Sequence, residues 1–280
     1  MNAPASRESS ALRICVIGGG NMGGAIVQRW LECTPQHEYR IIGRATRPDW
    51  LTKGATWFPH TNPGPALDGA DLVMLAVKPA QAAEVAEQTR NSLPPEALLV
   101  SVLAGVRLGR LAELFGRGER VYRCMPNTPF RLGCGISVLC GPALSPPDQK
   151  QAQARSAIQT LYALGGAVLW ADEGQMDFLT AALGSSPAFA YRFAGALALC
   201  IEARGFDAEQ ARTLAAAVVN GAGAMLMQTE APADVLIRQV ASPNGATQRG
   251  LELLSDGGYD ELITQAVAAA EQRSAELGRE

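Results

Sequence analysis

The chain has 280 residues, of which 48% are hydrophobic and 18% are charged, and its net charge at pH 7 is −3. The length allows two domains of ordinary size, and the composition is typical of a soluble globular protein. No basic run provides the cationic surface that nucleic-acid binding requires, and no apolar run approaches the roughly 18 residues of a membrane span.

Residues 1–10 have neither a basic start nor an apolar core, so we expect a disordered tail on a cytoplasmic protein. The six cysteines lack C-x-x-C spacing, which favours small core residues in a reducing compartment over a disulfide or a metal site. They are Cys15, Cys33, Cys124, Cys134, Cys140 and Cys200.

Residues 11–170 alternate short β-rich apolar runs with helical patterns, which predicts βαβ units and a parallel sheet. The predicted strands are 12–18, 39–43, 71–77, 97–105, 120–126, 135–140 and 167–170. Ala, Val and Leu recur at helical spacing over residues 79–93, so this segment should cross over the sheet. Ser145 followed by Pro146 predicts the start of another helix, which Gly165 and Gly166 should close.

After Ala171 the strand pattern stops, and residues 171–280 are predicted to form a separate all-helical domain. One helix should end at Gly205, and the next should begin at Asp207 with Gln210 at the capping-box position. Residues 215–227 are apolar on nearly every face, which is expected of a helix in a deep core or packed against a second copy of itself. The sequence therefore predicts a homodimer through the C-terminal helices.

Gly18, Gly20 and Gly23 form a G-x-G-x-x-G pattern between the first predicted strand and an apolar helix. The first glycine permits a tight turn, the second lets the backbone approach a pyrophosphate, and the third lets helix and strand pack closely. The N–H groups at the helix start would receive the phosphate charge. We therefore expect a Rossmann-type doubly wound sheet that binds a dinucleotide.

The second predicted strand ends at Gly43 and is followed by Arg44, with no Asp or Glu to bind a ribose 2′-hydroxyl. Arg44 can instead hold a 2′-phosphate through two hydrogen bonds, and Thr46 or Arg47 can assist. NADPH is therefore the expected cofactor, with NADH possible, and the alternative is a solvated arginine in a loop.

Residues 18–26, 75–81, 125–129 and 242–247 resemble, in order and spacing, the motifs of pyrroline-5-carboxylate reductases. The resemblance extends from about Leu12 to Leu277. It implies a Rossmann domain, a helical domain that dimerises, and in some members rings of dimers. It also implies reduction of the C=N bond of 1-pyrroline-5-carboxylate to L-proline, the last step of proline biosynthesis, with this small imino acid as the substrate.

The resemblance also implies roles for individual residues. Asn21 and Met22 would lie beside the pyrophosphate and Asn62 near the adenosine. The ribose and nicotinamide would be lined by Ala76, Val77, Lys78, Pro79, Met125, Pro126 and Asn127. The substrate would be bound by Ser242, Asn244, Gly245, Ala246 and Thr247.

Ser242 and Pro243 read as an N-cap and a first helical residue, and the free backbone N–H groups at such a helix start suit the substrate carboxylate. Thr247 could hydrogen-bond the ring nitrogen while Lys78 holds the nicotinamide, so these two are the candidate catalytic residues. The imine is basic enough to be largely protonated near neutral pH, and water could deliver the proton. His37 and His60 lie in unpatterned loops, where we expect solvent-exposed imidazoles without a role.

Several positions depart from the family pattern on the substrate side. Leu183 and Ser186 replace a serine and a glycine, and Phe189 replaces a tyrosine. Asn244 stands where a glycine is usual, and Arg238 stands where an aspartate is common. These changes leave two alternatives open: a reductase of another small cyclic imine or keto acid, or a non-catalytic paralogue that binds NADP.

Overall fold

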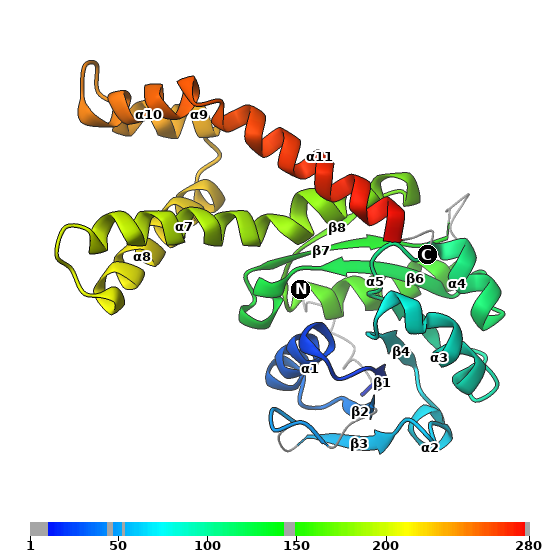
Figure 1. The fold of residues 1–280 in the computed structure, drawn as a ribbon. Coiled ribbons are helices and arrows are strands. Elements are labelled where there is room, and N and C mark those ends of the chain that lie inside the picture. Colours follow the sequence, from blue (N-terminus) through cyan, green and yellow to red (C-terminus); the bar gives the residue numbers. More distant parts are fainter. Residues whose placement is uncertain (1–10, 44–46, 52–53, 143–148, 278–280) are drawn as a thin grey trace, which may run out of the picture. The chain divides into compact units, whose positions relative to one another are not determined.

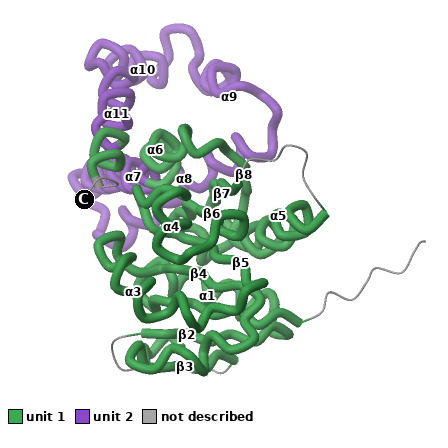
Figure 2. The backbone as a smooth tube through the Cα atoms, turned by 90° about the vertical axis from the view of Figure 1, so that its right-hand side faces the viewer, with its two compact units in different colours: residues 1–184, 271–280 green, residues 185–270 purple. Residues whose placement is uncertain are grey.

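The computed structural model describes residues 11–277 apart from 44–46, 52–53 and 143–148. The chain forms two compact units, one of residues 1–184 with 271–280 and the other of residues 185–270 (Figure 2). The units divide the chain at residues 184 and 185, whereas the sequence placed a domain boundary at residues 170 and 171. The predicted tail, residues 1–10, lies outside the described residues.

Among the described residues, the first unit contains one eight-stranded sheet in the order β3-β2-β1-β4-β5-β6-β7-β8 (Figure 1). The strands are β1 (Arg13–Ile17), β2 (Glu38–Gly43), β3 (Ala55–Pro59), β4 (Leu72–Leu75), β5 (Leu98–Ser101), β6 (Val121–Pro126), β7 (Gly135–Cys140) and β8 (Gly166–Trp170). Neighbouring strands are parallel except for β6 and β7. The predicted α/β fold is confirmed, whereas β3 was not predicted.

Helices cover both faces of this sheet because successive strand side chains alternate between the faces. On one face, Ile14 and Val16 pack with α1 (Asn21–Cys33) and α5 (Gln149–Ala163). On the other face, Cys15 and Ile17 pack with residues of three helices. These helices are α2 (Gly64–Leu67), α3 (Ala82–Thr89) and α4 (Leu108–Phe115). The predicted helix start at Ser145 and Pro146 lies outside the described residues.

The second unit is helical. Its helices are α7 (Ser186–Glu202), α8 (Ala208–Gln228), α9 (Ala233–Val240), α10 (Ala246–Asp256) and the start of α11 (Tyr259–Leu277), whose last residues group with the first unit. The predicted stop after α7 is confirmed by Gly205, which has φ +94°. The predicted capping box is confirmed at α8, where the Asp207 side chain accepts a hydrogen bond from the Gln210 N–H at 2.8 Å.

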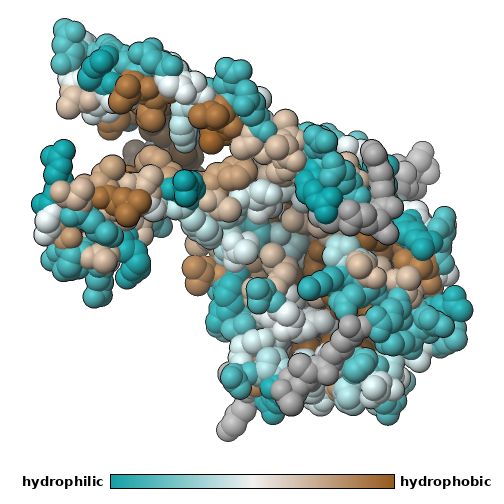
Figure 3. Space-filling view, viewed as in Figure 1, coloured by the Kyte–Doolittle hydropathy of each residue, from teal (hydrophilic) through white to brown (hydrophobic). Residues whose placement is uncertain are grey.

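Large apolar side chains are exposed on the helices of the second unit (Figure 3). On α7 and α8 they are Tyr191, Phe193, Leu199, Leu214, Val218, Met225, Leu226 and Met227. The buried residues of α8 are two small ones, Ala211 and Ala215. The large apolar side chains of this unit are therefore left without a core of their own.

None of the helices in the described parts of the chain has the length and hydropathy of a membrane span.

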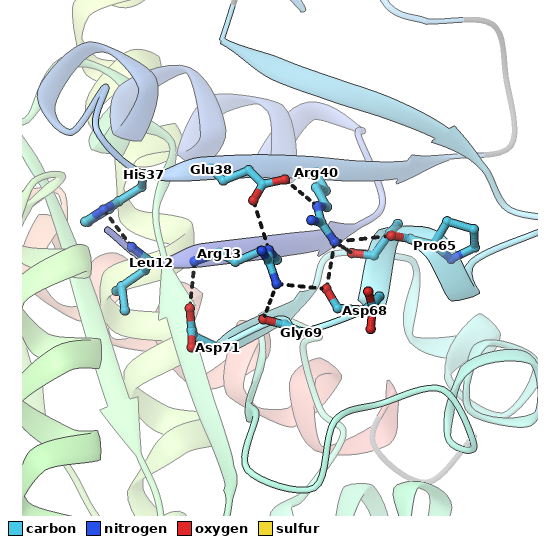
Figure 4. Close-up of polar contacts among 10 residues, drawn as sticks. Leu12, Arg13, His37, Glu38, Arg40, Pro65, Asp68, Gly69 and Asp71 are labelled. Carbon is cyan, nitrogen blue, oxygen red and sulfur yellow. Dashed lines mark hydrogen bonds and ion pairs between the residues drawn. The ribbon is translucent and has the colours of Figure 1, made fainter. Parts of the chain in front are cut away.

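At the amino edge of the sheet, charged side chains tie β1 and β2 to the turn before β4 (Figure 4). Glu38 accepts hydrogen bonds from Arg13 at 2.9 Å and from Arg40 at 2.7 Å. The two guanidinium groups also donate to the carbonyls of Gly69, at 3.1 Å, and Asp68, at 2.8 Å. Arg40 and Arg13 together lower the pKa of the Glu38 carboxyl. The carboxylate therefore stays charged and holds both arginines in place.

His37 is 9% exposed, so the expectation of a solvent-exposed imidazole is wrong for this residue. Its Nδ1 accepts a hydrogen bond from the backbone N–H of Leu12 at 3.2 Å (Figure 4). An imidazole can accept at this nitrogen only while the nitrogen carries no proton. Burial lowers the pKa of His37, in the direction that keeps the ring neutral.

Replacing His37 by Asn should weaken the acid sensitivity of the fold. Because burial lowers the pKa of His37 in the native state, the unfolded chain binds a proton more readily below the ordinary histidine value of about pH 6.5. The free energy of unfolding should therefore fall as the pH drops below that value, by at most about 1.4 kcal/mol per pH unit. The Asn oxygen can still accept from Leu12 but does not titrate. Urea unfolding of the wild type and the variant between pH 7 and pH 5 measures the difference.

A His60→Asn variant is the matched control, because the Leu12 N–H donates to His37, whereas the His60 backbone bonds to Gly43. If the free energy of unfolding changed with pH equally in the wild type and in His37→Asn, a buried, neutral His37 would be contradicted.

Candidate active site

The glycine cluster folds as a turn in which the backbone leaves no room for side chains. Gly18 has φ +108°, and its N–H donates to the Ile42 carbonyl at 2.8 Å. A Cβ built on Gly18 would overlap the Ala76 carbonyl, and one on Gly23 would overlap the Gly18 carbonyl. The ends of β1, β2 and β4 therefore meet directly, and the first turn of α1 packs against them.

Gly20 differs from its neighbours because it faces open space. It is the N-cap of α1, with extended backbone, and a Cβ built there would meet nothing within 4 Å. The helix starts at Asn21 without a side-chain cap, so N–H groups of its first turn remain available. A helix N-terminus of this kind, next to bare backbone, fits the pyrophosphate of a dinucleotide.

A cavity of about 370 Å³ opens beside this turn. Its lining includes five of the residues predicted to bind the cofactor: Gly18, Gly20, Ala76, Val77 and Lys78. It also includes residues that were not predicted: Trp57, His60, Gln81, Val85, Gln88 and Thr89. The cavity lies at the carboxyl ends of β1, β2 and β4, which is where open α/β sheets bind ligands.

The remaining predicted cofactor residues that the structure describes lie outside the cavity lining. Asn21 and Met22 begin α1, and Gly23 is buried beneath the turn. Asn62 lies exposed in the turn after β3, and Pro79 begins a 3₁₀ turn, Pro79–Gln81. Arg44 lies outside the described residues. The roles of these residues in cofactor binding stay predictions.

Trp57 and His60 enter the cavity from β3 and the residue that follows this strand. The His60 N–H donates to the Gly43 carbonyl at 3.1 Å, which holds the imidazole beside the end of β2. His60 is half-buried here, so the expectation of a solvent-exposed ring is wrong. The β-forming residues of Ala55–Pro59 are the signal that could have predicted this strand.

Lys78 brings a positive charge to the cavity wall. Its backbone N–H donates to Gln81 Oε1 at 3.2 Å, and its carbonyl accepts from the Gln81 N–H at 2.9 Å. The backbone of Lys78 is therefore fixed by the 3₁₀ turn, while the residue is exposed at the cavity wall. An ammonium group in this position suits a phosphate or another anionic part of a ligand.

Asn127 follows β6 and is 8% exposed. Its Oδ1 accepts from the Ile136 N–H at 2.9 Å, and its Nδ2 donates to the Leu183 carbonyl at 3.2 Å. The side chain thus joins the β6 end, with Met125 and Pro126, to β7 and to a π-helical turn, Thr180–Ser185. In this structure the Asn127 amide holds protein groups together.

A partly buried ion pair fixes the start of the segment that carries this π-helical turn. Arg123 on β6 is 3% exposed and pairs with Glu173, in the 3₁₀ turn Glu173–Gln175 before α6 (Met176–Leu179). The second oxygen of Glu173 accepts from the Leu108 N–H at 3.0 Å. Leu183 packs against an apolar cluster that includes Val138. A leucine in place of the usual serine therefore adds packing within the first unit.

The predicted substrate residues lie together on one turn of the second unit. The Gly245 N–H donates to the Ser242 carbonyl at 2.9 Å, Asn244 has φ +59°, and α10 begins at Ala246 with Gly245 as N-cap. The expectation of an N-cap at Ser242 and a helix start at Pro243 is therefore wrong. A left-handed residue at 244 is incompatible with a helical turn that includes it.

The turn nevertheless ends in a helix N-terminus whose first residues, Ala246 and Thr247, are exposed. Gln248 Oε1 accepts from the Asn244 N–H at 2.8 Å and holds the left-handed residue in place. Asn tolerates this conformation better than most residues other than Gly. The turn thus offers backbone N–H groups and the Thr247 hydroxyl to a small anionic ligand.

Comparison with known proteins relates both parts of the chain to one enzyme family. Residues 173–277 match the model "Pyrroline-5-carboxylate reductase dimerisation", and residues 13–105 match "NADP oxidoreductase coenzyme F420-dependent". The chain is 34% identical to pyrroline-5-carboxylate reductase of Pseudomonas aeruginosa, over 97% of this chain and 98% of the relative. It is 32% identical to that of Synechocystis, over 96% and 99%.

Solved structures agree with these similarities. The structure of a pyrroline-5-carboxylate reductase from Coxiella burnetii has 29% identity and a TM-score of 0.82, over 95% of this chain and 98% of that chain. The pyrroline carboxylate reductase of Plasmodium falciparum, solved with NADP bound, has 23% identity and a TM-score of 0.83, over 96% and 99%. At this identity the second likeness concerns the fold alone.

Replacing Gly20 by Ala should separate ligand binding from folding. The added methyl group meets no protein atom within 4 Å, so the melting temperature should stay unchanged. The methyl group would occupy the space where a pyrophosphate approaches the backbone, so NADPH should bind more weakly by about 1.5 to 3 kcal/mol, the value of one hydrogen bond to a charged group. Calorimetric titration measures the affinity for NADPH, and a thermal melt measures the melting temperature.

Gly109→Ala in α4 is the matched control, because a Cβ at this exposed helical glycine also meets nothing within 4 Å. Unchanged NADPH affinity in Gly20→Ala would rule out the pyrophosphate role.

Proposed function

The chain belongs to the pyrroline-5-carboxylate reductase family, and we propose that it reduces the C=N bond of 1-pyrroline-5-carboxylate to L-proline with NADPH. The observation that carries this proposal is the side-chain-free turn formed by Gly18, Gly20 and Gly23, which opens into the cavity. This turn provides the bare backbone and helix start that a dinucleotide pyrophosphate needs. The enzyme is thus an oxidoreductase of proline biosynthesis.

The bound cofactor supplies a hydride for the imine carbon, and the protein supplies the positions of both reactants. The N–H groups at the start of α1 bind the pyrophosphate, with Asn21 and Met22 beside it. Ala76, Val77 and Pro79 border the ribose and nicotinamide, and Lys78 offers its ammonium group to this part of the cofactor. Met125 and Pro126 form the other side of the ring site, and the Asn127 amide holds their strand end to Leu183.

On the substrate side, the N–H groups at the start of α10 bind the carboxylate of the imino acid. Ser242, Gly245 and Ala246 shape this turn, and Asn244 adds an amide next to it. The Thr247 hydroxyl hydrogen-bonds the ring nitrogen and orients the imine, while water delivers the proton. The substrate needs no strong protein acid because a cyclic imine is itself basic. Catalysis then consists mainly of holding the two reactants in contact.

The match of residues 173–277 to a dimerisation model supports a homodimer through the helical domain. The exposed apolar side chains of α7 and α8 supply the surface that such a contact buries. Further association of dimers into a ring is part of the proposal and can be measured by light scattering. We also infer a cytoplasmic location, in keeping with six free cysteines.

A second candidate function is reduction of a different small cyclic imine. The observation that favours it is Asn244, whose backbone is left-handed, with φ +59°, and whose amide side chain is added to the proposed carboxylate-binding turn. Its amide could hydrogen-bond a substituent that proline lacks. Comparison of turnover on five-membered and six-membered ring imines distinguishes the two candidates.

A steady-state assay of 1-pyrroline-5-carboxylate with NADPH, and then with NADH, tests the proposed function directly. We expect oxidation of NADPH with formation of L-proline. NADPH binding without any oxidation at saturating substrate would instead identify a non-catalytic NADP-binding protein.

Replacing Arg44 by Ala should weaken the use of NADPH selectively. Arg44 follows β2 in the sequence, and its guanidinium can pair with the 2′-phosphate, which NADH lacks. The value of kcat/KM for NADPH should fall by a factor that corresponds to about 1.5 to 3 kcal/mol of lost transition-state stabilisation, with little change for NADH. Equal losses with both cofactors would show that Arg44 does not contact the phosphate.

Replacing Thr247 by Ala should lower kcat about tenfold, the value of one hydrogen bond made in the transition state. The affinity for NADPH should stay unchanged. Thr247→Ser keeps the hydroxyl and should restore most of the rate, which separates the hydrogen bond from a packing effect. An unchanged kcat in the Ala variant would remove Thr247 from the mechanism.

A further inference from the structure

The indole ring of Trp57 lies between the glycine turn and the end of β2. A Cβ built on Gly43 would overlap Cη2 and Cζ2 of this ring, and one built on Gly19 would lie 3.0 Å from its Cζ3. The ring therefore contacts the bare backbone of both glycines. It also lines the cavity, together with Gly19, Gly43 and His60.

The strand pairing explains why the ring reaches this place. β3 is parallel to β2 at the edge of the sheet (Figure 1). In this pairing Trp57 lies opposite Ile41, and Pro59 lies opposite Gly43. Trp57 and Ile41 belong to the same sheet face and pack against the same apolar cluster. The indole leans along the strands from that position toward Gly43 and is held on one side by the core.

Gly43 is the last residue of β2, the position from which NAD-binding sheets usually present a carboxylate to the ribose 2′-hydroxyl. Here the position carries no side chain, and the indole fills the room that a side chain would need. The only polar atom of an indole is its N–H, which donates and cannot accept. A ribose 2′-hydroxyl at this place thus finds neither a carboxylate nor space for one.

We propose that Trp57 and Gly43 form a specificity-determining pair that excludes a carboxylate from the adenosine end of the cavity and thereby disfavours NADH. The inference rests on the proposed use of NADPH. It adds that the preference for NADPH over NADH depends on the Trp57 side chain of β3, which fills the space beside Gly43, as well as on contacts to the 2′-phosphate. An acidic residue at position 43 cannot then create an NADH site while Trp57 is present.

A double-variant cycle with Gly43→Asp and Trp57→Val tests the pair through the dissociation constants of NADPH and NADH, measured by calorimetry. In the Trp57→Val background, Gly43→Asp should tighten NADH binding about tenfold or more, the value of one charge-assisted hydrogen bond. In the wild-type background, the same Gly43→Asp change should give no gain for NADH. An equal gain in both backgrounds would overturn the proposal.

A second cycle tests the steric contact without any ligand. Gly43→Ala alone should lower the melting temperature, because its Cβ overlaps the indole. Combined with Trp57→Val, the change should cost less than the sum of the two single shifts, since the two residues share one contact. A Gly43→Ala variant as stable as the wild type would overturn the proposal, even if Gly43→Asp does not fold.

Phe58→Val is the matched control, because Phe58 is the next aromatic residue on β3 and packs against the cluster on the opposite sheet face. It should show no coupling to position 43. The outcomes also separate this inference from the proposed function. If the wild type reduces the substrate with NADPH but Gly43 and Trp57 show no coupling, the proposed pair alone is overturned. If the two residues are coupled in a protein that binds the nucleotide without turnover, the proposed function alone is overturned.

Discussion

The first unit depends on one close approach: the backbone of Gly18 lies against the Ala76 carbonyl, with no side chain between them. The Gly18 N–H also bonds to Ile42, so this residue joins the end of β1 to the ends of both neighbouring strands. β1 lies where the strand order reverses, because β2 and β4 flank it. The turn therefore sets the place of the cavity and directs the start of α1 toward it.

The two edges of the sheet carry different chemistry. At the amino edge, Glu38 is held between Arg13 and Arg40, and the charged groups satisfy carbonyls of the turn before β4. At the carboxyl edge, the cavity presents backbone, apolar side chains and polar ones such as His60 and Gln88, with a cation, Lys78, at its wall. Ion pairs thus stabilise the amino edge, whereas the close backbone packing of the Gly18 turn stabilises the carboxyl edge.

The helical unit solves a different physical problem. Its α8 buries only small side chains, while large apolar ones such as Leu214 and Met225 remain exposed. A helix with this pattern gains its stability when a partner covers it. In a family whose helical domain dimerises, the same surface explains why so apolar a segment is present in the chain.

The sequence by itself determined those features that local interactions control. These include the tight turn at Gly18, the missing carboxylate at Gly43 and the capping box of Asp207 and Gln210, because each depends on residue type and short spacing. Periodicity in the same way predicted the doubly wound sheet and the helical C-terminal part. One local prediction was wrong: the helix expected at Pro243 begins at Ala246, because Asn244 takes a left-handed conformation that its neighbours stabilise.

Only the tertiary structure decided which distant residues meet. The sequence gives no sign that Trp57 fills the space beside Gly43, or that Asn127 bonds to Leu183, 56 residues further along. His37 likewise reads as a loop histidine until the fold buries it against Leu12. Such contacts are fixed by strand order and by the packing of both sheet faces, which are properties of the whole chain and are absent from any short stretch of it.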